Sequence, residues 1–335
     1  MKSTMLPWKT RLLIYVFSFI TRAACRADGT VNRRLLSVLD LLNPRPNGKP
    51  VHGVRTADIT VDPSRSLWFR LFVPTEKVAS NGSGLPVIVF FHGGGFVLLS
   101  ADAKNYDILC RQFARKMPAV VVSVNYRLSP ENRFPAPYDD GFDVLKFLDS
   151  RKLEAIPANA DLSRCFLAGD SAGANLAHHV ACRAGKEVAL REVKLVGLIS
   201  IQPFFGGEER TESEIRFRAD RLVSMDRTDW LWKAFLPEGS NRDHEAANVS
   251  APKTADISEL DYPATLVCVG GLDPLQDWQR RYYQWLKSSG KEVSMIEYPN
   301  AIHGFLVFPE LPETSLLLEN MREYIQNQCR RNNVN

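Results

Sequence analysis

Short apolar runs alternate along most of the chain with longer segments in which apolar residues return at helical spacing. A run of four to eight apolar residues is typical of a strand, and a period near 3.6 residues is typical of an amphipathic helix. We predict strands at Ala57–Asp62, Ser66–Val73, Val87–Phe91, Ala119–Asn125, Cys165–Ala168, Leu195–Ile201, Thr265–Gly270 and Glu292–Tyr298.

The first two of these runs alternate apolar and polar residues, as antiparallel edge strands do, and Pro63 marks the turn between them. Most later runs are nearly continuous in apolar residues, which is typical of parallel strands covered on both faces. Strands that alternate with helices predict an α/β protein with a mostly parallel central sheet covered by helices. In such a sheet the functional site lies at the carboxyl ends of the strands.

Two segments fall outside this alternation. We expect residues 1–50 to form an N-terminal lid, residues 51–335 to form the main domain and residues 204–236 to be a cap inserted into it. The lid should cover the mouth of the site, so its removal should change KM more than it changes the rate of the chemical step. Its apolar residues recur at helical spacing and should face the pocket or core, with Arg11 and Arg22 outward. They are Leu12, Leu13, Val16, Phe17 and Ile20.

Gly169-Asp170-Ser171-Ala172-Gly173 separates a predicted strand from a helical pattern. A serine between two such glycines is typical of a nucleophile on a sharp strand-to-helix turn, because glycine lets the backbone pass closely. The amino end of the following helix directs N–H groups toward a developing negative charge. Ser171 is therefore the candidate nucleophile.

A second glycine motif, His92-Gly93-Gly94-Gly95-Phe96, directly follows the strand predicted at Val87–Phe91. Consecutive glycines expose backbone N–H groups, as an oxyanion hole requires when it shares the task with the residue after the nucleophile. A phosphate-binding P-loop would need Lys and then Ser or Thr after its last glycine, and Phe96 stands there instead. We predict an oxyanion hole formed by Gly93, Gly94, Gly95 and Ala172.

A nucleophilic serine needs a histidine base and an acid that orients it, in the chain order Ser, acid, His. His303 lies in a loop just after the last predicted strand, where such a base is expected. Asp273 ends an earlier strand and is favoured as the acid because Pro274 keeps it extended; Asp277 is the alternative. The histidines interpreted as surface or supporting residues are His52, His178, His179 and His244.

Several motifs recur in one order: His92–Gly95, Val124–Glu131, Phe134–Gly141, Gly169–Asn175, Asp273–Leu275 and His303–Phe305. Together they resemble the α/β-hydrolase family of plant carboxylesterases related to hormone-sensitive lipase. The resemblance covers nearly the whole chain and implies an α/β-hydrolase fold with a serine esterase site. Arg26–Arg33 is also similar to the lid of the gibberellin receptors of this family, which have lost the catalytic histidine. Because His303 is present here, the resemblance favours an enzyme.

Composition agrees with a soluble enzyme, at 45% hydrophobic and 24% charged residues. Residues 1–50 hold nine basic and two acidic residues, so they carry +7 and the remainder −3. Such an arm suits nucleic acid or anionic membranes, but no nucleic-acid-binding motif accompanies it. Its apolar stretch is too short to span a membrane, although it resembles a short signal peptide. Six cysteines without metal-ligand spacing indicate free thiols, so we expect a cytoplasmic protein, with secretion as the alternative.

These motifs predict two-step acyl transfer, in which Ser171 attacks an ester, His303 takes the proton and Asp273 holds the imidazole. The reaction needs no metal or organic cofactor. The expected partner is a small-molecule ester, with no nucleic acid and no integral membrane span. Arg127 and Glu131 are interpreted as an ion pair beneath the site. A small-molecule receptor using the same pocket is the alternative function, and an acyltransferase is a third.

Overall fold

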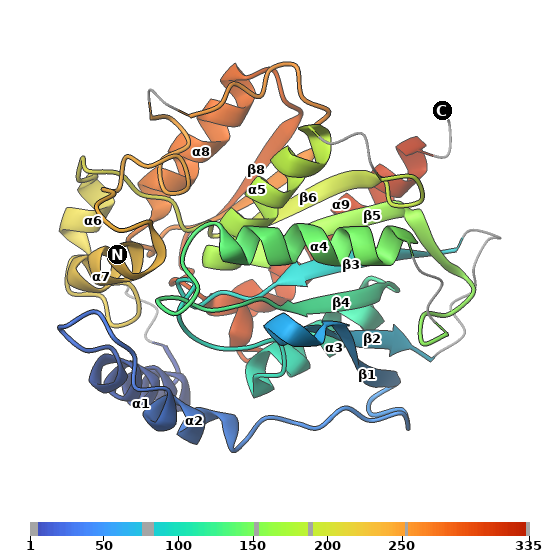
Figure 1. The fold of residues 1–335 in the computed structure, drawn as a ribbon, viewed down its shortest axis with the longest axis horizontal. Coiled ribbons are helices and arrows are strands. Elements are labelled where there is room, and N and C mark those ends of the chain that lie inside the picture. Colours follow the sequence, from blue (N-terminus) through green and yellow to red (C-terminus); the bar gives the residue numbers. More distant parts are fainter. Residues whose placement is uncertain (1–5, 76–83, 151–153, 187–189, 252–253, 333–335) are drawn as a thin grey trace.

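The centre of the computed structural model, which describes residues 6–75, 84–150, 154–186, 190–251 and 254–332, is one sheet of eight strands (Figure 1). The spatial order is β1-β2-β4-β3-β5-β6-β7-β8. Strand β2 pairs antiparallel with β1 and β4, and all other neighbours are parallel. Every predicted strand overlaps an observed one, and the mostly parallel sheet is confirmed. The strands are β1 (Val54–Asp62), β2 (Leu67–Pro74), β3 (Leu85–Phe91), β4 (Val120–Asn125), β5 (Ala160–Asp170), β6 (Leu195–Ile201), β7 (Thr265–Gly270) and β8 (Val293–Tyr298).

Helices cover both faces of this sheet (Figure 1). Helices α4 (Ala136–Ser150), α5 (Ala172–Lys186) and α8 (Gln276–Ser288) pack on one face, and α3 (Lys104–Lys116) and α9 (Pro312–Asn332) pack on the other. Successive side chains of a strand point to opposite faces. In β3, Val87, Val89 and Phe91 accordingly join one buried cluster, and Ile88 and Phe90 join the other.

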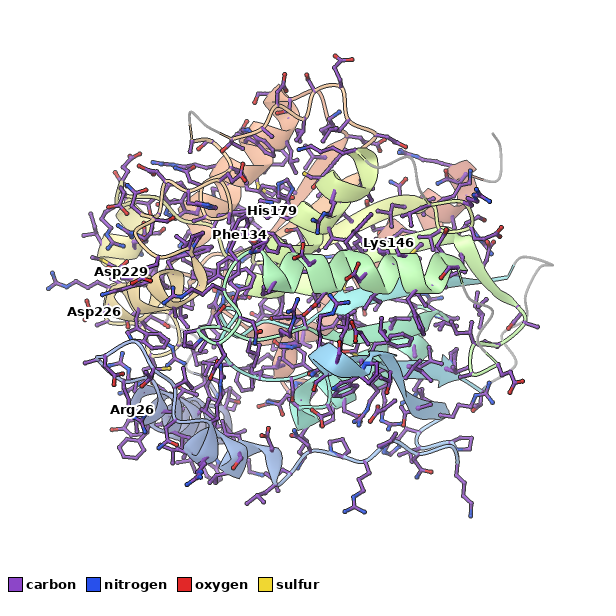
Figure 2. All side chains as sticks on the ribbon, in the orientation of Figure 1. Arg26, Phe134, Lys146, His179, Asp226 and Asp229 are labelled. Carbon is purple, nitrogen blue, oxygen red and sulfur yellow. The ribbon has the colours of Figure 1, made fainter. Side chains whose placement is uncertain are left out.

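The N-terminal arm contains α1 (Trp8–Ala24) and α2 (Arg33–Asp40), which pack against each other, and α1 lies beside α7 (Met225–Phe235) (Figure 1). Figure 2 shows Arg26 of the arm on the same side of the molecule as Asp226 and Asp229 of α7. Hydrogen bonds join the two regions across this contact. They link Ser18 Oγ to Arg221 O, Arg22 Nη2 to Ser224 Oγ, Arg227 Nη2 to Thr21 Oγ1, and Trp230 Nε1 to Arg26 O.

The buried face of α1 is more polar than predicted, since its buried residues are Thr10, Ile14, Ser18, Thr21 and Ala24. Each buried polar side chain has a hydrogen-bond partner: Ser18 and Thr21 bond residues around α7, and Thr10 Oγ1 donates to Glu310. The prediction that Leu12 faces the pocket or core is wrong, because this residue is 54% exposed and does not line the cavity over Ser171. Leu13, Val16 and Phe17 do line a cavity. Neither α1 nor any other helix in the described part of the chain is long and apolar enough to cross a membrane.

Candidate active site

Ser171 stands on the tight turn that joins β5 to α5. Its φ of +53° is a left-handed conformation that is rare for residues other than glycine. Its N–H donates to Ile201 O of β6 at 2.9 Å. The flanking glycines are required by space, because a Cβ on Gly173 would lie 2.0 Å from Phe91 O and one on Gly169 would lie 2.3 Å from Gly173 O. The turn therefore holds Ser171 at the carboxyl end of β5.

Ser171, His303 and Asp273 meet at this edge of the sheet. Ser171 Oγ lies 3.0 Å from His303 Nε2, and His303 Nδ1 lies 2.8 Å from Asp273 Oδ2. Asp273 follows β7 and His303 follows β8, so three separate strand ends supply the three side chains. All three residues are buried. When Nδ1–H donates to the carboxylate, Nε2 is left as an acceptor for the serine proton.

The Asp273 carboxylate accepts several hydrogen bonds besides the one from His303. Its donors are the backbone N–H of Leu275 at 2.8 Å, Gln202 Nε2 at 2.9 Å and Gln279 Nε2 at 2.8 Å. Asp277 is directed elsewhere, since its carboxylate accepts from the backbone N–H of Ser213 at 2.8 Å. The structure therefore brings Asp273, and not the alternative Asp277, to His303.

Gln202 is a site residue that the sequence motifs did not indicate. Its side-chain N donates to Asp273 Oδ2 at 2.9 Å and to Ile302 O at 3.0 Å, and its side-chain O accepts from Gly304 N–H at 2.8 Å. These bonds hold the acid and the backbone on both sides of His303. The φ of Gln202 is +45°, which is unfavourable for glutamine. Its only sequence signal is its position directly after β6.

The pKa of His303 is set by two opposing influences. Burial lowers it, but the charge of Asp273 and the hydrogen bond to that carboxylate raise it, and the net result is a pKa above the ordinary value. The nearby Asp170 acts in the same direction. The surroundings therefore stabilise the imidazolium that would form when Ser171 loses its proton.

The glycine loop places backbone N–H groups beside Ser171. The N–H of Gly93 is already occupied, because it donates to Tyr106 Oη at 2.8 Å and to Asp170 Oδ1 at 3.0 Å. Gly94 and Gly95 line the same cavity as Ser171. Among the described residues no acceptor binds the amides of Gly94, Gly95 or Ala172. Of the predicted set, these three amides are therefore without an acceptor in the described part of the chain, whereas that of Gly93 is occupied.

Asp170 is buried beneath this loop, next to the nucleophile. Its carboxylate accepts hydrogen bonds from Tyr106 Oη at 2.9 Å and from the backbone of Gly93. Burial raises the pKa of Asp170 to about 7, although the hydrogen bond from Tyr106 lowers it. Its carboxyl group therefore titrates near neutral pH, which is unusual for an aspartate and common in functional sites.

The two histidines of α5 pack against buried tyrosines in the core. His178 Nδ1 lies 2.8 Å from Tyr262 Oη, and the His179 ring stacks on Tyr138 with centroids 4.5 Å apart. Burial lowers the pKa of His178 and brings that of His179 to about 3, so both are neutral. They are supporting residues, and neither lies at the surface.

A cavity of about 350 Å³ opens over Ser171 and His303. Gly94 and Gly95 also line it, and its walls come from the arm and from residues 204–236. The wall residues include Leu13, Val16 and Phe17 of α1, together with Phe204, Leu222, Val223 and Leu231. A small, largely apolar pocket with a few polar groups at one end is typical of a site for a small organic molecule.

Arg227 brings a cation to the wall of this cavity. Its Nη2 donates to Thr21 Oγ1 at 2.8 Å, whereas Nη1 is buried and has no hydrogen-bond partner among the described residues. Burial lowers the pKa of Arg227 to about 10, so the group remains charged at neutral pH. A buried guanidinium nitrogen without a partner can accommodate an acceptor from a ligand.

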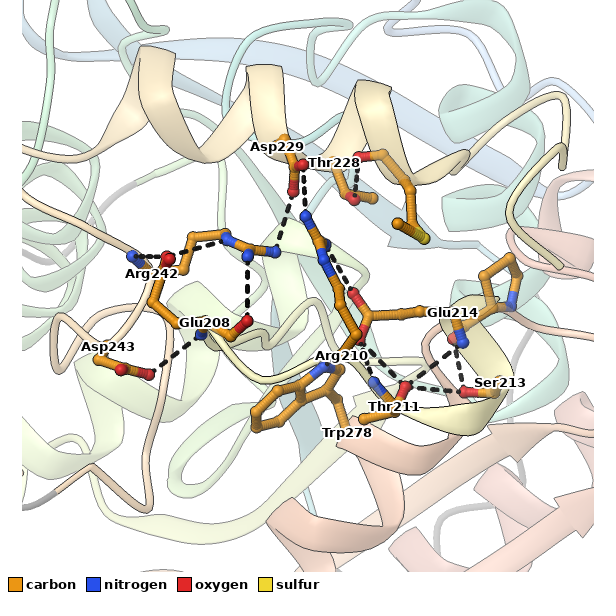
Figure 3. A network of polar contacts seen from close by, with 12 residues as sticks. Glu208, Arg210, Thr211, Ser213, Glu214, Thr228, Asp229, Arg242, Asp243 and Trp278 are labelled. Atoms are coloured by element: carbon orange, nitrogen blue, oxygen red, sulfur yellow. Dashed lines mark hydrogen bonds and ion pairs between the residues drawn. The ribbon is translucent and has the colours of Figure 1, made fainter. Parts of the chain in front are cut away.

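A polar network in residues 208–243 supports the loop that carries Asp273 (Figure 3). Its ion pairs are Arg210–Glu214, Arg210–Asp229, Arg242–Asp229 and Arg242–Glu208. Trp278 Nε1 donates to Glu214 at 2.9 Å, and Ser213 Oγ donates to Pro274 O at 2.7 Å. Because Pro274 follows Asp273, the segment between β6 and β7 is tied to the acid loop.

The predicted ion pair between Arg127 and Glu131 is wrong. Arg127 pairs with the buried Asp140 at 2.9 Å, and Glu131 pairs with Arg33 of α2. Arg33 and Glu131 are 98 residues apart, so no local pattern connects them. The loop after β4 is therefore attached to the arm.

The family described as having the α/β-hydrolase fold matches residues 88–307, and the chain belongs to this family. Solved esterases have the same architecture. The hyperthermophilic esterase of Pyrobaculum calidifontis is 28% identical, with a TM-score of 0.72 over 97% of this chain and 99% of that chain. The predicted α/β-hydrolase fold is confirmed.

Two kinds of plant relative are similar to this chain. The gibberellin receptor GID1C of Arabidopsis thaliana is 39% identical over 336 residues, which cover 97% of this chain and 96% of the receptor. Carboxylesterase 20 of Arabidopsis thaliana is 37% identical over 285 residues, which cover 83% of this chain and 86% of the relative. The resemblance to plant carboxylesterases and their receptor relatives is therefore confirmed.

Proposed function

We propose that this protein is a serine carboxylesterase that hydrolyses small-molecule esters with short acyl groups. The observation that carries the proposal is the continuous hydrogen-bonded series of Ser171 Oγ, His303 and Asp273, with distances of 3.0 and 2.8 Å. The esterases among the relatives and solved structures support the same class of reaction. In this proposal residues 1–50 are a lid and residues 204–236 a cap over the main domain, residues 51–335.

Acylation begins when Ser171 Oγ attacks the ester carbonyl carbon and His303 Nε2 accepts its proton. The carbonyl oxygen becomes an oxyanion, which the amides of Gly94, Gly95 and Ala172 stabilise. Loss of one such donor typically lowers kcat by about 10²–10³-fold. His303 then gives its proton to the leaving alcohol.

Deacylation repeats these steps with water in place of serine. His303 removes a proton from the water, which attacks the acyl carbon on Ser171. The bond from that carbon to Ser171 Oγ then breaks, His303 returns the proton to Oγ and the acid is released. Asp273 holds the imidazole in the tautomer that keeps Nε2 free, and it stabilises the imidazolium in both halves of the reaction.

The first prediction concerns the nucleophile. A fluorophosphonate probe should label Ser171, and Ser171→Ala should abolish both labelling and turnover of an aryl acetate. His303→Ala should lower kcat by several orders of magnitude, whereas His244→Ala, a half-buried histidine in another loop, should retain it. Mass spectrometry of the labelled peptide identifies the residue. Labelling of a different serine, or none in folded protein, would contradict the assignment.

A small-molecule receptor is the second candidate function, and one observation favours it. Arg227 lines the cavity that holds Ser171, and its buried Nη1 has no hydrogen-bond partner among the described residues. A carboxylic acid of the gibberellin type would supply such an acceptor, and a gibberellin receptor is among the relatives. Calorimetry with such an acid, beside aryl-ester turnover, separates the two functions. Micromolar or tighter binding without turnover would support the receptor, and turnover without binding would support the esterase.

A further inference from the structure

Arg33, the first residue of α2, joins the N-terminal arm to the loops around the candidate oxyanion hole. Its Nη1 donates to Val97 O, and its Nη2 donates to Ser129 O at 2.6 Å. The same guanidinium binds both carboxylate oxygens of Glu131. One side chain of the arm therefore holds two backbone carbonyls and one carboxylate of the main domain.

The two residues whose carbonyls Arg33 binds are themselves bonded to the glycine loop. Val97 N–H donates to Gly94 O at 3.1 Å, and Ser129 N–H donates to Phe96 O at 2.9 Å. In each case the carbonyl of the residue contacts Arg33 and its amide contacts the loop. Val97 therefore links Arg33 to Gly94, and Ser129 links Arg33 to Phe96.

The glycine loop has a backbone conformation that depends on such support. Phe96, the last residue of the loop, has a φ of +64°, and Leu99, three residues beyond it, has a φ of +72°; both values are costly for residues with a side chain. Conformations of this kind persist only where surrounding contacts hold them. The Phe96 ring is held by stacking on Phe235, with centroids 3.8 Å apart, and Arg33 holds the backbone.

We propose that Arg33 is a positioning residue for the oxyanion hole, so that the seated arm completes the active site as well as covering it. The proposal rests on the esterase function proposed above. With the arm seated, Arg33 keeps Gly94 and Gly95 directed toward the carbonyl oxygen of the substrate. When the arm lifts, the carbonyls of Val97 and Ser129 lose these donors and the loop can relax. Turnover is thereby coupled to closure of the arm.

The test compares Arg33→Met with Arg22→Met. Arg22 also fastens the arm, through Ser224 Oγ at 3.1 Å, but it does not contact the glycine loop or its neighbours. Arg33→Met should lower kcat for an aryl acetate by about 10- to 100-fold, because small misplacements of reacting groups cost this much. Arg22→Met removes one attachment of the arm but leaves the contacts of Arg33 with Val97 O and Ser129 O in place. Its KM should therefore change while its kcat stays within about threefold of wild type.

A trifluoromethyl ketone gives a readout that is specific for the oxyanion hole, because its adduct with Ser171 places a negative oxygen there. In Arg33→Met its inhibition constant should rise by the same factor by which kcat/KM falls. Glu131→Gln is the matched control for charge. It keeps both carbonyl contacts of Arg33, so kcat should stay within about threefold of wild type.

Wild-type kcat and inhibition constant in folded Arg33→Met would overturn the proposal, as would equal losses of kcat in Arg33→Met and Arg22→Met. If circular dichroism shows that Arg33→Met does not fold, Arg33→Lys replaces it, with a smaller loss of kcat and the same parallel change in inhibition expected. A wild-type protein with neither turnover nor labelling at Ser171 would instead contradict the esterase function itself.

Discussion

His303 is the residue through which pH should control the proposed reaction. Only neutral His303 accepts the serine proton, and Asp273 raises its pKa above the ordinary value despite burial. A raised pKa keeps the imidazole protonated to higher pH. The kcat/KM for an aryl ester should therefore rise with pH and then level off, and the midpoint of the rise should lie above about pH 6.5. A pH–rate profile measures this midpoint.

Removal of the Asp273 carboxylate should lower the pKa of His303, which tests the same influence in the opposite direction. Asp273→Asn should lower kcat by about 10⁴-fold and move the midpoint of the remaining rise to lower pH, because the charge that raises the pKa of His303 is lost. Asp277→Asn is the matched control and should leave the midpoint in place, since Asp277 binds Ser213 and Arg280. A larger loss in Asp277→Asn than in Asp273→Asn would show that Asp277 is the acid.

Asp170 should make the folded protein less stable as pH rises. Burial raises its pKa to about 7 in the folded state, above the ordinary 3.8. Between these values the folded protein keeps a proton that the unfolded chain has released, so this group lowers the free energy of unfolding by up to about 1.4 kcal/mol per pH unit. Asp170→Asn should gain stability over wild type at pH 8 relative to pH 5. Urea titrations measure this, and an equal difference at both pH values would contradict it.

Among the elements, α1 presents two different surfaces to its surroundings. Val16 lines the cavity, whereas Leu12 is exposed and does not line it. Val16→Trp should fill part of the pocket and lower kcat/KM for an aryl hexanoate roughly tenfold more than for the acetate. Leu12→Trp adds the same side chain outside the pocket and should leave this preference unchanged. A similar change of preference in both variants would show that α1 does not form the wall of the acyl site.

In the whole molecule, the N-terminal arm is connected by contacts to the loops of the candidate active site. The cavity is lined by the arm, the glycine loop, the segment between β6 and β7, and the loop of His303. The segment between β6 and β7 binds the arm through Arg227 and Thr21, and it binds the Asp273 loop through Ser213 and Pro274. Contacts of the arm therefore extend to the Asp273 loop, through the segment between β6 and β7, as well as to the glycine loop.

The sequence by itself determined the parts of this protein whose information is local. Thr265–Gly270 and Leu195–Ile201 are observed strands with the predicted bounds, because a buried strand needs a continuous apolar run. The turn at Ser171 follows in the same way from its two glycines, since only glycine fits the close approach of the backbone there. Chain order also indicated Ser171, Asp273 and His303 as a set.

Only the tertiary structure decided how distant segments meet. The contact of Arg33 with Glu131 and that of Gln202 with Asp273 join residues 98 and 71 positions apart, and no periodicity relates them. The orientation of α1 was decided in the same way, because polar contacts with the residues around α7 outweigh its apolar spacing. Local patterns specify elements, whereas side-chain contacts between elements depend on the assembled fold.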